Sequence, residues 1–77
     1  MEENLQNKIY NHLDAFAKNI KLERLARGWT QKDVAAQMEI KTQSYQAYES
    51  GVAVPTIENL LKISIIFDMS IDDLFEL

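Results

Sequence analysis

The sequence predicts an all-helical domain, and three observations lead to that fold class. No stretch alternates apolar and polar residues with the two-residue period of a half-buried strand. The residues that most strongly interrupt regular structure occur at only three positions: Gly28, Gly51 and Pro55. Apolar residues between them recur at three- and four-residue steps, and capping residues precede the apolar runs. We therefore expect five helices in the 77 residues.

The first and longest helix is expected near the amino terminus. Its apolar residues lie three or four positions apart and so share one helical face: Leu5, Ile9, Leu13, Phe16 and Ile20. Arg24 and Arg27 suit the negative end of the helix dipole, and Gly28 can end the helix in a left-handed conformation. We divide the chain into an amino-terminal helical extension, residues 1–16, and a compact domain, residues 17–77.

Two short helices are expected in the middle of the chain. Thr30 is a typical N-cap and, with Asp33 three residues later, forms a capping-box pattern that begins a helix ending at Met38. The residues Glu39-Ile40-Lys41 interrupt it, and a second short helix is predicted at about 42–50, followed by Gly51. The pattern is helix, three-residue turn, helix.

Two further helices are expected in the last third of the chain. Thr56 can cap a helix whose apolar residues include Leu60, Leu61, Ile63 and Phe67. Ser70 and Asp73 repeat the capping-box spacing and predict a short final helix.

The middle segment has the residue types of a helix-turn-helix. Ala35 is small enough for two helices to cross closely, and Tyr45 and Tyr48 can anchor the second helix in the core. At about 100° per residue, that anchoring turns the other face outward: Thr42, Gln43, Gln46, Ala47 and Ser50. Glutamine can bond adenine in two places, threonine can bond several base edges, and an alanine methyl can touch the thymine methyl. This helix therefore suits the major groove of DNA.

From Ile20 to Leu77 the sequence resembles the Xre/Cro/CI family of bacterial and phage repressors, whose domain is called lambda-repressor-like. The resemblance rests on several motifs in matching order and spacing: Arg24, Gly28-Trp29-Thr30-Gln31, Val34-Ala35, Ile40, Tyr48-Glu49-Ser50-Gly51, Pro55-Thr56, Leu60-Leu61, Ile63 and Ser70-Ile71-Asp72-Asp73-Leu74. It implies a five-helix domain that binds double-stranded operator DNA as a two-fold homodimer. The amino-terminal extension adds length to the first helix.

The resemblance also implies roles for individual residues. Thr42, Gln43 and Ala47 match base-reading positions, and Gln46 is added from its place on the same face. Gln31 and Ser50 match positions that contact DNA phosphates. An arginine of the first helix pairs in this family with the glutamate that ends the recognition helix, which here implies an Arg24–Glu49 ion pair with a structural role.

Three features of the sequence depart from the family pattern. Glu39 replaces the usual glycine, so the turn must hold a non-glycine residue in a left-handed conformation or take another geometry. Lys41 replaces a serine cap, and we expect it to contact a phosphate instead. The linker 52–54, Val-Ala-Val, is apolar where relatives carry basic residues.

Net charge bears on the kind of partner. The chain carries 8 basic and 12 acidic side chains, a net charge of -4, which disfavours indiscriminate adhesion to nucleic acid or anionic lipid. The acidity belongs to the two ends. Residues 18–62 hold seven cations against five carboxylates, a net charge of +2, whereas residues 63–77 hold four carboxylates and no cation. The helix-turn-helix segment can therefore still approach DNA.

The residue inventory gives little support to catalysis, cofactor binding or membrane insertion. The chain has no cysteine, and its one histidine, His12, has no second ligand residue that would indicate a metal site. No nucleophile-base pair or glycine-rich phosphate loop is recognisable. No apolar run approaches the ~20 residues of a membrane span, and the acidic start Met1-Glu2-Glu3-Asn4 is unlike a signal peptide. We expect a cytoplasmic protein that is not an enzyme and binds no metal or cofactor.

Two functions follow from these patterns. The first is a sequence-specific transcriptional regulator, a repressor that binds a palindromic operator as a homodimer through the C-terminal helix, with the N-terminal helix as a second candidate contact. The alternative is a protein-interaction module, antitoxin-like or partner-binding, that keeps the fold with little DNA binding. The acidity and the apolar linker favour the alternative, and the polar face of the recognition helix favours the first.

Overall fold

The computed structural model describes residues 4–77 as five α-helices, and within that range it contains no β-strand. The helices are α1 (Leu5–Ala26), α2 (Gln31–Met38), α3 (Thr42–Ser50), α4 (Ile57–Phe67) and α5 (Ile71–Phe75). The predicted all-α fold with a central helix-turn-helix is confirmed. Residues 1–3, which the predicted extension 1–16 includes, lie outside the described residues.

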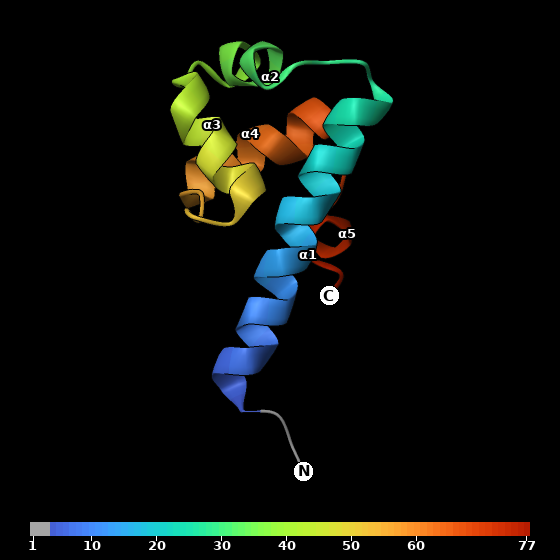
Figure 1. Ribbon diagram of the computed structural model, residues 1–77. Coiled ribbons are helices and arrows are strands. Elements are labelled where there is room, and N and C mark those ends of the chain that lie inside the picture. The colour runs from blue at the N-terminus through green and yellow to red at the C-terminus, as the bar shows by residue number, and fades with distance from the viewer. Residues whose placement is uncertain (1–3) are drawn as a thin grey trace.

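Helix α1 is continuous over 22 residues and crosses the boundary drawn between residues 16 and 17. The Asn4 side chain begins it by accepting the backbone N–H of Asn7 at 2.8 Å. Its second half supplies buried residues to the core, including Phe16 and Ile20. Figure 1 shows the first turns of α1 projecting beyond the rest of the domain, and Leu5 there is 74% exposed.

The α2–turn–α3 unit is built from local capping. The Thr30 hydroxyl accepts the N–H of Asp33 at 3.0 Å, and the Asp33 carboxylate accepts the N–H of Thr30 at 2.8 Å, which completes the predicted capping box. Glu39 ends α2 in the left-handed conformation, with φ 60°. The N–H of Ile40 then donates to the carbonyl of Ala35 at 3.0 Å, which closes the turn before α3. A non-glycine residue therefore occupies the left-handed position of the turn.

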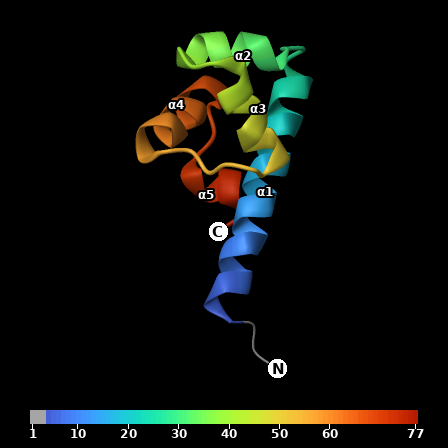
Figure 2. The ribbon, with the colours of Figure 1, turned by 60° about the vertical axis from the view of Figure 1, so that its left-hand side comes forward.

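A core between α1, α2, α3 and α4 holds these elements together. Its fully buried side chains include Val34, Met38, Tyr45, Ile63 and Phe67. Figure 1 shows α4 passing behind α3 and below α2, and Figure 2 shows it beside α3 on the side away from α1. The Lys62 ammonium donates to the Met38 carbonyl at 3.0 Å, so α4 also satisfies the carboxyl end of α2.

Helix α5 packs against α1. The rings of Phe16 and Phe75 stack with centroids 4.7 Å apart, and the Asn19 amide donates to the carbonyl of Leu74 at 3.0 Å. The His12 Nδ1 lies 2.8 Å from the Phe75 carbonyl. Because a carbonyl only accepts, His12 carries its proton on Nδ1 there. This histidine serves to dock the C-terminal helix.

Candidate nucleic-acid interface

The face of α3 opposite the core is the candidate interface. Tyr45 is fully buried and Tyr48 is 7% exposed, so both tyrosines anchor the helix inward as predicted. Their rings meet edge to face with centroids 6.4 Å apart. The Tyr48 hydroxyl also accepts a hydrogen bond from the Asn59 amide at 3.0 Å. The two anchors fix which side of α3 faces solvent.

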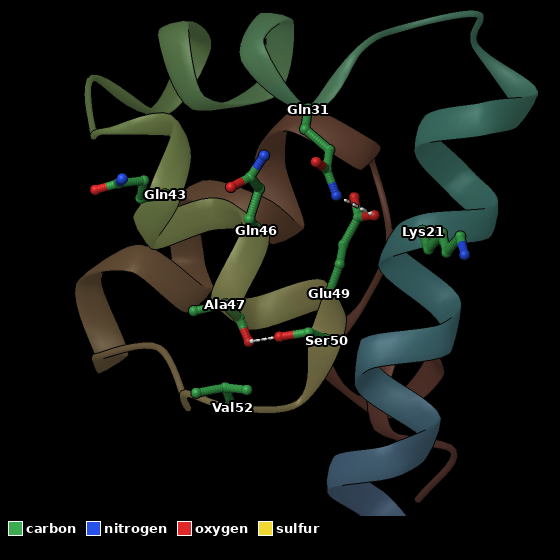
Figure 3. Close-up of a pocket in the computed structure, with 8 residues that line it drawn as sticks. All are labelled: Lys21, Gln31, Gln43, Gln46, Ala47, Glu49, Ser50 and Val52. Atoms are coloured by element: carbon green, nitrogen blue, oxygen red, sulfur yellow. Dashed lines mark hydrogen bonds between the residues drawn. The ribbon is translucent and has the colours of Figure 1, made fainter.

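The predicted base-reading residues lie together along that outer side. Gln43 and Gln46 are exposed, whereas Thr42 and Ala47 are half-buried. Figure 3 shows an open hollow around this part of α3; its lining residues are Lys21, Gln31, Gln43, Gln46, Ala47, Glu49, Ser50 and Val52. Two uncharged amide side chains are therefore presented to solvent beside a small apolar surface, which is the chemistry that hydrogen-bonds base edges and touches a thymine methyl.

A bidentate ion pair holds the carboxyl end of α3 to α1. The Arg24 Nε lies 2.7 Å from Glu49 Oε2, and Arg24 Nη2 lies 3.0 Å from Glu49 Oε1. The two side chains are only 10% and 3% exposed. Arg24 Nη1 also donates to the Trp29 carbonyl at 2.9 Å, so the same guanidinium fixes the loop before α2. This contact has the geometry and burial of a positioning element.

Gln31 is joined to the same carboxylate. Its Nε2 donates to Glu49 Oε1 at 3.1 Å, and Figure 3 shows the side chain reaching from α2 toward Glu49. The predicted phosphate contact is thus half-buried and already uses one N–H within the protein. Its amide retains a second N–H and a carbonyl oxygen. Gln31 therefore connects the amino end of α2 with the carboxyl end of α3.

Burial and hydrogen bonding shift the pKa values of three neighbouring side chains, the cluster of Arg24, Tyr45 and Glu49. Burial raises the pKa of the Glu49 carboxyl. Hydrogen bonds from Arg24 and Gln31, with the electrostatic effect of the nearby Tyr45 hydroxyl, outweigh burial and hold that pKa below its ordinary 4.5. The hydrogen bonds to Glu49 raise the pKa of Arg24. Burial raises the pKa of Tyr45 far above its ordinary value, and the carboxylate adds to the effect. At neutral pH the cluster contains a charged pair beside a neutral phenol.

The Tyr45 hydroxyl is the least satisfied atom of the cluster. It lies near enough to the carboxylate to affect its charge. Its geometry falls short of a hydrogen bond, and no partner for it is found among residues 4–77. The Tyr45 hydroxyl therefore acts on the Glu49 carboxylate electrostatically.

The other predicted phosphate contacts lie at the two ends of α3. Lys41 is the exposed N-cap of the helix and makes no side-chain capping bond, so its ammonium can extend toward solvent. Ser50 is exposed, and its hydroxyl donates to the Ala47 carbonyl at 3.2 Å. Gln31 and Ser50 line the hollow, and Lys41 directly precedes α3.

Two residues of the hollow were not predicted from the sequence. Lys21 is exposed on α1, one helical turn before Arg24, and so lies on the side of α1 that meets α3. The sequence could have identified Lys21, because it lies one helical turn before Arg24, which the predicted ion pair brings against the end of α3. Val52 follows α3 in the linker and is 83% exposed. Its sequence position carries no signal for this placement.

Among residues 4–77, no helix is long and apolar enough to cross a membrane. The same residues contain no group of three or more side chains suited to holding a metal ion.

The arrangement of a capped first helix, a tight turn and a second helix with a polar outer face defines a helix-turn-helix domain. A family model described as helix-turn-helix matches residues 20–74. The chain belongs to this family, in its Xre/Cro/CI type.

Two curated relatives carry the same domain. The cryptic phage CTXphi transcriptional repressor RstR of Vibrio cholerae is 44% identical over 52 residues, which are 68% of this chain and 46% of the relative. The uncharacterized HTH-type transcriptional regulator YqaE of Bacillus subtilis is 36% identical over 61 residues, 79% of this chain and 53% of the relative. The chain spans about half the length of these relatives. No solved structure matches it.

Proposed function

We propose that the protein is a DNA-binding transcription regulator that represses a promoter by binding a palindromic operator as a homodimer. The observation that carries the proposal is the outer face of α3, where Gln43 and Gln46 are exposed on a helix held by the Arg24–Glu49 pair. Family membership and the printed names of the two relatives support the same function.

The proposed contacts divide into two kinds. Gln43, Gln46, Ala47 and Thr42 read base edges, and Gln31, Lys41 and Ser50 contact the phosphate backbone. Only one of the three proposed phosphate contacts, Lys41, is a cation, and Lys21 adds a second beside the hollow. Because each cation that neutralises a phosphate contributes close to one unit of slope in log K against log salt, we expect a shallow salt dependence. Specificity then depends on the base contacts more than on charge.

Selection of binding sites from a random duplex library tests this function. The expected product is an inverted repeat whose half-sites lie about 10 base pairs apart centre to centre. Binding to the selected site should weaken with salt, and Lys41→Ala should reduce the slope by about one. Lys8→Ala, which removes an exposed cation from the protruding turns of α1, is the control. If no sequence is enriched at low salt, the proposed regulator function is refuted.

The alternative function, a protein-interaction module, is favoured by one observation. The linker after α3 exposes two valines, Val52 at 83% and Val54 at 61%, next to the candidate interface. Exposed apolar groups of this kind suit a protein surface more than a phosphate backbone. A purified protein that enriches no DNA site and forms a stoichiometric complex with a protein encoded by a neighbouring gene would favour this function.

A further inference from the structure

Val52, the second residue after α3, presents its side chain beside the outer face of that helix. It is 83% exposed, and it lines the same hollow as Gln43, Gln46 and Ala47. Figure 3 shows Val52 directly below Ala47. The linker therefore continues the apolar part of the candidate interface beyond the end of α3.

Backbone hydrogen bonds fix the place of Val52. Gly51 ends α3 in the left-handed conformation, with φ 79°, and its N–H donates to the Tyr48 carbonyl at 3.4 Å. The N–H of Ala53 donates to the Ala47 carbonyl at 3.1 Å, and the Ala53 side chain packs against the core. Val52 is thus held between two anchored residues. Because a β-branched side chain is stiff at χ1, it presents its methyl groups in a fixed direction.

The other exposed valine of the linker belongs to a different surface. Val54 is 61% exposed and lines a separate cavity of about 160 Å³, whose wall includes Tyr10 and Leu13 of α1. The two valines therefore share residue type, linker and exposure but face different parts of the molecule. Of the two, Val52 is the one that lies with the base-reading residues.

The chemistry of DNA limits what Val52 can contact favourably. Phosphate oxygens are bound by cations, polar side chains and backbone N–H groups, and a valine side chain supplies none of these. Along the major groove the base edges carry hydrogen-bond donors and acceptors, and their apolar group is the C5-methyl of thymine. Contact between that methyl and a valine removes apolar surface of both from water. A valine on a base-reading surface therefore favours thymine.

We propose that Val52 determines specificity by contacting the C5-methyl group of a thymine in each half-site of the operator. The assignment rests on the proposed function, because it gives one more residue of the same interface a base to read. The linker 52–54 carries no charge. It thus adds specificity to the interface and does not add phosphate binding.

Uracil substitution tests this contact, because uracil differs from thymine only in lacking the C5-methyl group. Each thymine of the selected operator is replaced by uracil in turn, and competition binding measures the affinity of the parent protein and of Val52→Ser. At the thymine that Val52 reads, uracil should lower the affinity of the parent about fourfold, the effect of one buried methyl group. The same uracil should leave the affinity of Val52→Ser nearly unchanged.

Val54→Ser is the matched control, since it makes the same substitution at the other exposed valine of the linker. It should show the same uracil effects as the parent at every thymine. Thermal melting of both variants checks the fold. Because both side chains are exposed, both melting temperatures should stay close to that of the parent.

A second series of duplexes tests the methyl group apart from the rest of the base. At the position assigned to Val52, a cytosine–guanine pair in place of thymine–adenine should weaken binding. Placing 5-methylcytosine there should restore about fourfold of the affinity of the parent, because it returns the methyl group to the same edge of the groove. It should restore little in Val52→Ser.

Three results would overturn the assignment and leave the proposed function standing. They are uracil effects that are equal in Val52→Ser and the parent at every thymine, an equal loss of uracil sensitivity in Val54→Ser, and a selected operator that contains no thymine. A protein partner that covers the linker would also overturn it: both valine variants would then weaken that complex, and neither would change a uracil effect. If selection enriches no sequence at all, the proposed function fails and the assignment of Val52 fails with it.

Discussion

Arg24 and Glu49 form a two-pronged ion pair that is almost closed to solvent, with N–O distances of 2.7 and 3.0 Å. The pair connects α1 to the end of α3, and Gln31 donates to the same carboxylate from α2. The three helices that frame the candidate interface therefore meet at one carboxylate.

Arg24→Ala should lower the free energy of unfolding by about 3–5 kcal/mol, because it leaves the Glu49 charge buried without its partner. In a domain of this size that corresponds to a fall in melting temperature of more than about 10 °C. Lys18→Ala, an exposed substitution on the same helix, should change the melting temperature little. Equal melting temperatures for the Arg24 variant and the parent protein would show that the pair contributes nothing to stability.

The same carboxylate predicts acid sensitivity. Because the folded pKa of Glu49 lies below its ordinary 4.5, its contribution to stability is complete above that pH and is lost as pH falls through the folded pKa. Denaturant titrations between about pH 6 and 2 measure this loss. Glu49→Gln should be less stable at pH 6 and should lose less stability on acidification. A parallel pH profile for the two proteins would contradict the assignment.

The turn between α2 and α3 predicts a stabilising substitution. Glu39 has φ 60°, a conformation that costs a side-chain-bearing residue roughly 1 kcal/mol relative to glycine. Glu39→Gly should therefore raise the melting temperature by a few degrees, about 4–8 °C per kcal/mol. Glu39→Ala, which also removes the carboxylate but keeps the Cβ atom, is the control for charge. A gain from alanine equal to that from glycine would assign the effect to charge and not to backbone conformation.

The outer face of α3 predicts a loss of specificity without a loss of fold. Gln43→Ala should weaken binding to the selected operator by about 1–3 kcal/mol and leave binding to random duplex unchanged, since a base contact is removed and no phosphate contact is. Gln37→Ala, another exposed glutamine but on α2, should leave both affinities unaltered. Competition binding with both duplexes measures the ratio. Equal losses on both duplexes would show that Gln43 does not read bases.

Local signals made most of the fold predictable. The capping patterns at Thr30 and Ser70 act within four residues, and both residues are N-caps in the structure. Only Thr30 completes the predicted reciprocal capping box, whereas Ser70 accepts the N–H of Asp73 at 3.0 Å without a return bond from Asp73. The left-handed Glu39 was one of two geometries that remained open, because the energy of a turn also depends on how the flanking helices pack.

Long-range contacts account for what the sequence did not predict. The Gln31–Glu49 hydrogen bond depends on the distance between the ends of α2 and α3, which no local pattern encodes. The apolar residues of the C-terminal helix looked available to a partner, but α1 covers them through Phe16, which is separated from Phe75 by most of the chain. The exposed aliphatic residues of α4 are visible in the sequence only as part of a hydrophobic helix. Burial decides which of its apolar residues remain outside.

The unbroken course of α1 has a mechanical consequence. Its 22 residues form a rod of roughly 33 Å at 1.5 Å per residue, with the exposed Leu5 in its first turn and Arg24 in its last. A force applied to the protruding turns, for example by a fused protein, is transmitted along this helix to the Arg24 guanidinium, which bonds Glu49 of α3. An attachment at the amino end therefore acts on α3 through the Arg24–Glu49 pair, whereas an attachment after Leu77 acts first on the short α5.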